Sequence, residues 1–61
     1  DYDTRRALVR DRIKTHPSAT LTELAEQTGY SVPYLSDVLR GCPGKKSMPV
    51  IRAAEDYVKG L

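Results

Sequence analysis

The chain has no tryptophan and no phenylalanine, and only one cysteine and one histidine, among its 61 residues. Its core must therefore be built from leucine, valine, isoleucine and alanine, with some of the four tyrosines. Cys42 is alone, which excludes an internal disulfide, and one histidine beside it is too few ligands for an ordinary zinc site. We therefore expect a domain without metal or cofactor, in a reducing compartment.

Long apolar runs are also lacking. No segment approaches the roughly 20 consecutive apolar residues that a membrane-spanning helix needs, and no signal peptide is recognisable. With 39% hydrophobic and 30% charged residues, the composition is that of a folded globular protein. We expect a single domain, residues 1–61, which buries only about 60% of its unfolded surface.

The charges are unevenly distributed, although the net charge is only +2. Residues 1–30 carry five basic and five acidic side chains, whereas the segment from Arg40 to Arg52 carries four basic side chains and no acidic one. A local basic segment is typical of a surface that meets phosphate. It is equally typical of a solvated loop with lysines that favour solubility.

The first helical segment, residues 4–15, is rich in helix-forming residues. Its predicted apolar contacts are Leu8, Val9 and Ile13. His16 precedes Pro17 and so avoids the helical conformation, which ends the helix there. We also expect the His16 side chain to interact with the final carbonyls of this helix.

The second segment begins at Thr20 and ends at Gly29. Thr20 and Glu23 form the T-x-x-E pattern of a capping box, in which two amides at the helix start are satisfied. Four residues share one face of this helix of about two turns: Leu21, Leu24, Ala25 and Thr28. Gly29 stands where a left-handed C-cap is needed.

In the third segment Ser31 is the predicted N-cap, Pro33 is tolerated in the first turn, and Gly41 ends the helix. Its apolar side consists of Leu35, Val38 and Leu39.

The fourth segment runs from Ser47 to about Lys59, with Pro49 in its opening turn and Gly60 as its predicted C-cap. A continuous buried stripe is predicted for Val50, Ile51, Ala54, Tyr57, Val58 and Leu61. No segment alternates convincingly as a β-strand. The patterns together predict an all-α fold, a small bundle of four short helices.

Only residues 29–31 separate the second segment from the third, and such a short turn containing glycine forces two helices to cross steeply, as in a helix-turn-helix. The stretch "LAEQTGYSVPYLSDVLRG" resembles the helix-turn-helix of the lambda repressor/Cro-type DNA-binding domains. The matching positions are Ala25 at the contact of the two helices, Gly29 in the turn, Leu35 and Val38 in the core, and Pro49 at the start of the next helix. The resemblance covers about residues 20–61 and is weaker over residues 1–19.

A second resemblance involves nearly the same residues. "TLTELAEQTGYSVPYLSDVL" is similar to one half of an AraC-type DNA-binding unit. That unit carries two such motifs, whereas this chain has one, so the first family fits better.

Both resemblances imply a prokaryotic or phage transcription regulator that binds double-stranded DNA, in the nucleoid or in the cytoplasm of a host cell. We do not expect an enzyme, because the serines and aspartates show no arrangement with His16 that catalysis needs. A helix of about three turns fits the major groove, which is about 12 Å wide. In the family's pattern, the residues that face base edges are Ser31, Val32, Pro33, Ser36 and Asp37. The residues expected to contact phosphates are Thr20, Thr22, Tyr34, Arg40, Lys45 and Lys46, together with the amides that open the second helix.

The base-facing positions depart from the family, which often has glutamine, asparagine or arginine there. Val32 suits a thymine methyl group and Ser36 donates or accepts, but Asp37 is repelled by phosphate unless it accepts from a cytosine amino group. Arg40 is the only obvious donor for a bidentate contact, each of which is worth about 1–3 kcal/mol. We therefore expect modest specificity from a monomer, raised if a homodimer binds a two-fold site.

Other interpretations of the same residues stay open. The chain is alternatively a protein-interaction module, such as an antirepressor or assembly factor, which docks through residues 48–61 or the face of residues 32–40. The turn alternatively serves packing alone, and Tyr34 is either a half-buried core aromatic or a phosphate contact. The basic residues of the first helix, interrupted by Asp11, are expected to form a solvated face, unless the first two reach a DNA backbone: Arg5, Arg6, Arg10, Arg12 and Lys14.

Overall fold

The computed structural model describes all residues from 1 to 61 and contains four helices and no strand. They are α1 (Tyr2–Thr15), α2 (Leu21–Thr28), α3 (Val32–Arg40) and α4 (Met48–Lys59). The predicted bundle of four short helices is therefore confirmed. None of the helices combines the length and the apolar character needed to cross a membrane.

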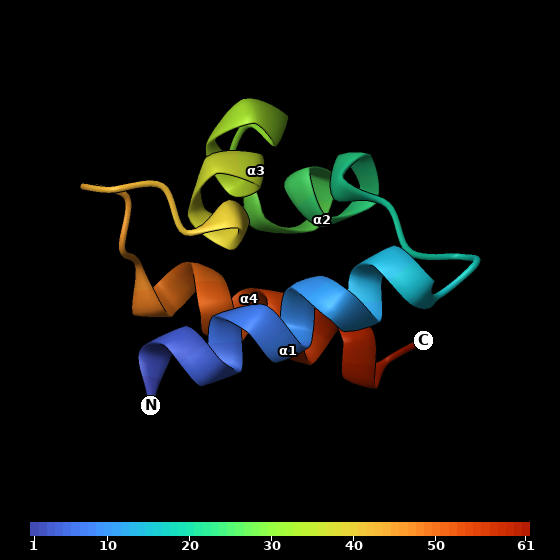
Figure 1. Ribbon diagram of the computed structural model, residues 1–61. Coiled ribbons are helices and arrows are strands. Elements are labelled where there is room, and N and C mark those ends of the chain that lie inside the picture. The colour runs from blue at the N-terminus through green and yellow to red at the C-terminus, as the bar shows by residue number, and fades with distance from the viewer.

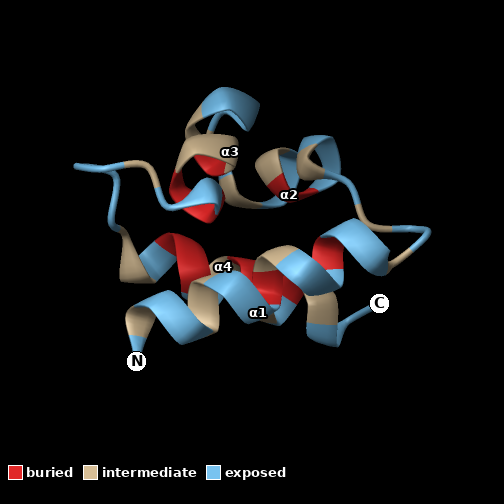
Figure 2. Ribbon diagram, in the orientation of Figure 1, coloured by how far each residue is buried: buried red, intermediate tan, exposed pale blue.

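The helices form two layers (Figure 1). The long helices α1 and α4 lie side by side in one layer, and the shorter α2 and α3 form the other. The buried residues of each layer face the opposite layer (Figure 2), so that the core lies between them. The α2–α3 pair is thus supported from one side by α1 and α4, which leaves its other side open.

Each helix begins with a short polar side chain that accepts a hydrogen bond from an amide three residues later. These N-caps are Asp1, Thr20, Ser31 and Ser47. The cap at Asp1 accepts from the amide of Thr4 at 2.8 Å, which explains why α1 begins earlier than predicted. Gly60 does cap α4, but its φ of −86° is not left-handed.

Ten buried side chains make up the core: Val9, Ile13, Leu24, Leu35, Val38, Leu39, Val50, Ile51, Ala54 and Tyr57. Two predictions were wrong. Leu8 is 61% exposed. The face of α1 that turns towards the core carries Val9 and Ile13, and Leu8 lies to one side of that face. Leu61 is 42% exposed because it follows the end of α4 and does not continue the helical stripe. Val58 is only half-buried.

Candidate nucleic-acid interface

The connection between α2 and α3 is defined by two local devices. Gly29 has a φ of 82° and its amide donates to the carbonyl of Ala25 at 2.8 Å, which ends α2. Ser31 is extended, and its hydroxyl accepts from the amide of Tyr34 at 3.3 Å, which begins α3. The orientation of α3 is therefore fixed at both ends of the short turn.

The outer side of α3 carries the residues predicted to face DNA bases. Leu35, Val38 and Leu39 are buried and fix the inner side. Ser31, Val32 and Pro33 are exposed, and Ser36 and Asp37 are half-buried. All five predicted base-facing residues therefore lie outside the buried inner side of α3, three of them exposed and two half-buried.

Asp37 and Arg40 form an ion pair on this outer side. The Arg40 guanidinium donates to the Asp37 carboxylate at 2.6 Å. This hydrogen bond, together with the negative charge of Asp37, raises the pKa of Arg40 above its usual value. The negative charge of Asp37 is therefore compensated by its neighbour, a pairing that lowers the repulsion expected between Asp37 and a phosphate.

The N-terminus of α2 differs from the predicted capping box. The Thr20 hydroxyl accepts from the Glu23 amide at 3.1 Å, as expected. The Glu23 carboxylate does not bind the Thr20 amide, because the hydroxyl of Tyr57 lies between the two groups. This hydroxyl accepts from the Thr20 amide at 3.0 Å and donates to Glu23 at 2.6 Å, and the hydrogen bond to Glu23, with burial, raises the pKa of Tyr57.

The Tyr57 bridge also changes which groups at α2 are free for phosphate. The Thr20 amide is occupied, whereas Thr22 is exposed and makes no hydrogen bond through its side chain. The loop before α4 contributes two exposed lysines, Lys45 and Lys46. Of the predicted phosphate contacts, these three side chains are exposed and form no hydrogen bond or ion pair.

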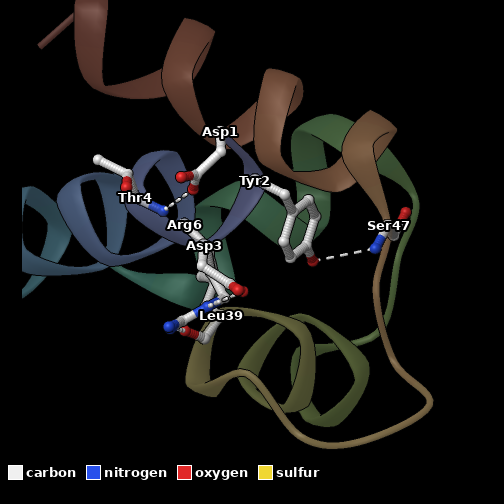
Figure 3. A network of polar contacts seen from close by, with 7 residues as sticks. All are labelled: Asp1, Tyr2, Asp3, Thr4, Arg6, Leu39 and Ser47. Atoms are coloured by element: carbon white, nitrogen blue, oxygen red, sulfur yellow. Dashed lines mark hydrogen bonds and ion pairs between the residues drawn. The ribbon is translucent and has the colours of Figure 1, made fainter.

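A second tyrosine holds this loop in place (Figure 3). The Tyr2 hydroxyl accepts from the amide of Ser47 at 3.0 Å. The ammonium group of Lys46 lies 5.3 Å from the centre of the Tyr2 ring, within the range of a cation–π contact. Lys46 is therefore positioned by α1, while Lys45 has no such partner. Sequence reasoning missed Tyr2 because its contacts are 44 and 45 residues away.

Arg5 and Arg6 do not belong to a solvated face, contrary to the prediction. Arg5 donates two hydrogen bonds to Glu55, at 2.9 and 2.6 Å, and so joins α1 to α4. Arg6 donates to the carbonyl of Leu39 at 2.8 Å, near the end of α3 (Figure 3). Both side chains bind groups on other helices of the protein, Arg5 with 40% of its side chain still exposed.

Local contacts bear on two smaller predictions. The His16 ring does not meet the last carbonyls of α1. The backbone amide of His16 donates to the carbonyl of Arg12 at 3.0 Å, and Nδ1 of the His16 ring accepts from the amide of Ser18. Tyr34 is half-buried against the core, with its ring centre 5.5 Å from that of Tyr30, so packing accounts for its position.

No three His, Cys, Asp or Glu side chains gather as a metal site requires. Comparison with known proteins finds no matching family model, curated protein or solved structure. The candidate site is therefore defined by the geometry of α2, α3 and the loop before α4.

Proposed function

We propose that the chain is a sequence-specific DNA-binding domain of a prokaryotic or phage transcription regulator, in which α2 and α3 act as a helix-turn-helix. The observation that carries the proposal is the outer side of α3, where Ser31, Val32, Pro33 and Ser36 are all small. A helix with small outer side chains approaches base edges closely when it enters the major groove. Lys45 and Lys46 follow the same helix and supply charge for phosphates.

In this mechanism α3 lies in the major groove with its N-terminal turn nearest the bases. Val32 contacts a thymine methyl group, and the Ser36 hydroxyl donates to or accepts from a base edge. Asp37 accepts from a cytosine amino group while Arg40 remains beside it. Thr22 and the two lysines bind phosphates and set the register.

Specificity from one copy is modest, since no outer residue of α3 other than Arg40 makes a bidentate contact. A homodimer on a two-fold site doubles the contacts and raises the specificity. The chain needs no cofactor or small-molecule ligand for this activity.

The second candidate function, a protein-interaction module, is favoured by a different surface. Leu8 is exposed on α1. Val58 is half-buried in the last turn of α4, and the exposed Leu61 follows the end of that helix. Leu8 and Val58 line one shallow groove, and Val58 and Leu61 line another beside it. A protein partner that uses these residues docks on the layer of α1 and α4, so it leaves the outer side of α3 free.

Two kinds of substitution test the DNA proposal. Lys45→Ala removes a phosphate contact, so we expect weaker binding to every duplex. We also expect the salt slope, the slope of the logarithm of the binding constant against the logarithm of the salt concentration, to be smaller by about one unit. Val32→Ala and Ser36→Ala remove base contacts, so we expect them to change the preference among duplexes. Lys59→Ala, at the far end of α4, is the matched control for charge. Equal losses on all duplexes for Val32→Ala and Ser36→Ala would contradict base contact by α3.

A further inference from the structure

A row of basic residues runs along one face of α1. Arg6, Arg10 and Lys14 are spaced four residues apart, which places them on neighbouring turns of the same side. Arg6 is engaged by the carbonyl of Leu39, whereas Arg10 and Lys14 form no ion pair. Like charges at this spacing repel, so the row destabilises α1 unless an anion lies between its members.

The row borders α3. A groove between α1 and α3 is lined by Arg10, Lys14, Ser36 and Arg40, with Ile13, Leu21 and Leu39 as its apolar part. Arg10, Lys14 and Arg40 also line the adjoining hollow, together with Arg6, Ala7 and Asp11. Three cationic side chains from two helices therefore meet at one place.

The acidic groups around this groove cancel only part of its charge. Asp37 pairs with Arg40 and compensates its charge, and Asp11 lines the adjoining hollow without an ion pair, so Arg10 and Lys14 are the unpaired cations of the groove. The groove contains no aromatic ring on which a base stacks. The guanidinium group of Arg10 is unpaired and suits the paired oxygens of a phosphate, and Lys14 adds an unpaired ammonium group. This chemistry fits a backbone phosphate better than a base.

We propose that this groove binds a backbone phosphate of the same DNA duplex that α3 enters, so that α1 is part of the interface. The inference rests on the proposed function. Ser36 and Arg40 belong both to the outer side of α3 and to the groove, so DNA that meets Ser36 is carried next to Arg10 and Lys14. The contact adds to those of the loop lysines and increases the salt dependence of binding.

The test compares two pairs of charge-removing substitutions in the full chain. Arg10→Gln and Lys14→Gln remove charge from the groove. Arg12→Gln and Lys59→Gln remove the same charges beside Leu8 and Val58, away from α3. Binding to one duplex is measured by fluorescence anisotropy at several salt concentrations, and folding of each variant is checked by circular dichroism.

Because the groove binds one phosphate, we expect the double variant to lower the salt slope by about one unit and each single variant by less, while the controls leave it unchanged. Equal losses in the control pair would overturn the groove proposal, because bulk charge would then explain them. An unchanged slope in the Arg10 and Lys14 variants, with losses for Lys45→Ala, would reject the groove but leave the proposed function standing. No binding by the wild-type chain would reject both. If Arg10→Gln does not fold, exposed Lys14 and its control Lys59 carry the comparison.

Discussion

Gly29 and Gly41 both have a left-handed backbone, with φ of 82° and 80°, but their surroundings differ. A Cβ at Gly29 meets nothing within 4 Å, whereas one at Gly41 lies 3.0 Å from Cζ of Arg6. Gly29→Ala therefore costs only the backbone strain, about 1–2 kcal/mol. Gly41→Ala should cost more, because it also displaces Arg6 from the Leu39 carbonyl. Urea unfolding of both variants measures the difference, and equal losses would contradict the position of Arg6.

Tyr57 also has a specific role, since its hydroxyl joins the Thr20 amide to the Glu23 carboxylate. Tyr57→Phe keeps the buried ring but removes both hydrogen bonds. We expect the melting temperature to fall by at least about 4–8 °C, the change typical of losing one net hydrogen bond in a domain of this size, since two are removed.

The control for this change is Tyr30→Phe, because the Tyr30 hydroxyl makes no hydrogen bond in the structure. Its melting temperature should stay near that of the wild type. A Tyr57→Phe variant as stable as Tyr30→Phe would show that the bridge between α4 and α2 contributes nothing.

At this scale the sequence predicts caps well and long-range contacts poorly. Thr20, Ser31 and Gly29 were assigned correctly, because a cap depends on residues three or four positions away. The bridge made by Tyr57 and the anchor made by Tyr2 were missed. Their partners lie 34 to 45 residues away, where no local pattern connects them.

At the scale of elements, α1 is joined to α4 by the ion pair of Arg5 and Glu55. The hydrogen bonds from Arg5 hold the pKa of Glu55 below its usual value of 4.5. Because the folded-state pKa is lowered, this contribution to stability is present above pH 4.5 and is lost as the pH falls below it.

We therefore predict that Glu55→Gln melts at a lower temperature than the wild type at pH 7. The difference should shrink as both are acidified from pH 7 to about pH 3, since the unfolded chain takes up a proton at Glu55 below pH 4.5 and the stability gained from the pair is lost progressively. Glu26→Gln, which removes an exposed carboxylate without an ion pair, serves as the control. A difference that stays constant from pH 7 to pH 3 would argue against the pair.

The helices themselves were predictable, because prolines, glycines and N-caps mark their ends. The buried face of α1, in contrast, was not predictable. Its apolar residues are few, and Leu8 and Val9 are adjacent, so the pattern did not show that only Val9 and Ile13 enter the core. The same difficulty hid the roles of Arg5 and Arg6, which depend on where α3 and α4 pack.

At the scale of the whole molecule, α1 and α4 form a support on which α2 and α3 rest (Figure 1). The ten core residues lie between the layers, so the outer side of α3 has no part in the packing. The inner residues of α3, Leu35, Val38 and Leu39, were recognisable from the sequence, whereas the base-facing role of the other residues stays a prediction.

The most direct test of the central claim is a titration of isotope-labelled protein with generic duplex DNA at low salt, followed by backbone amide chemical shifts. The account predicts that amides of residues 20–22, 31–37 and 40–47 move while those of residues 50–61 stay in place. Shifts confined to α4, or no shifts at all, would contradict insertion of α3 into DNA and would direct the search to a protein partner.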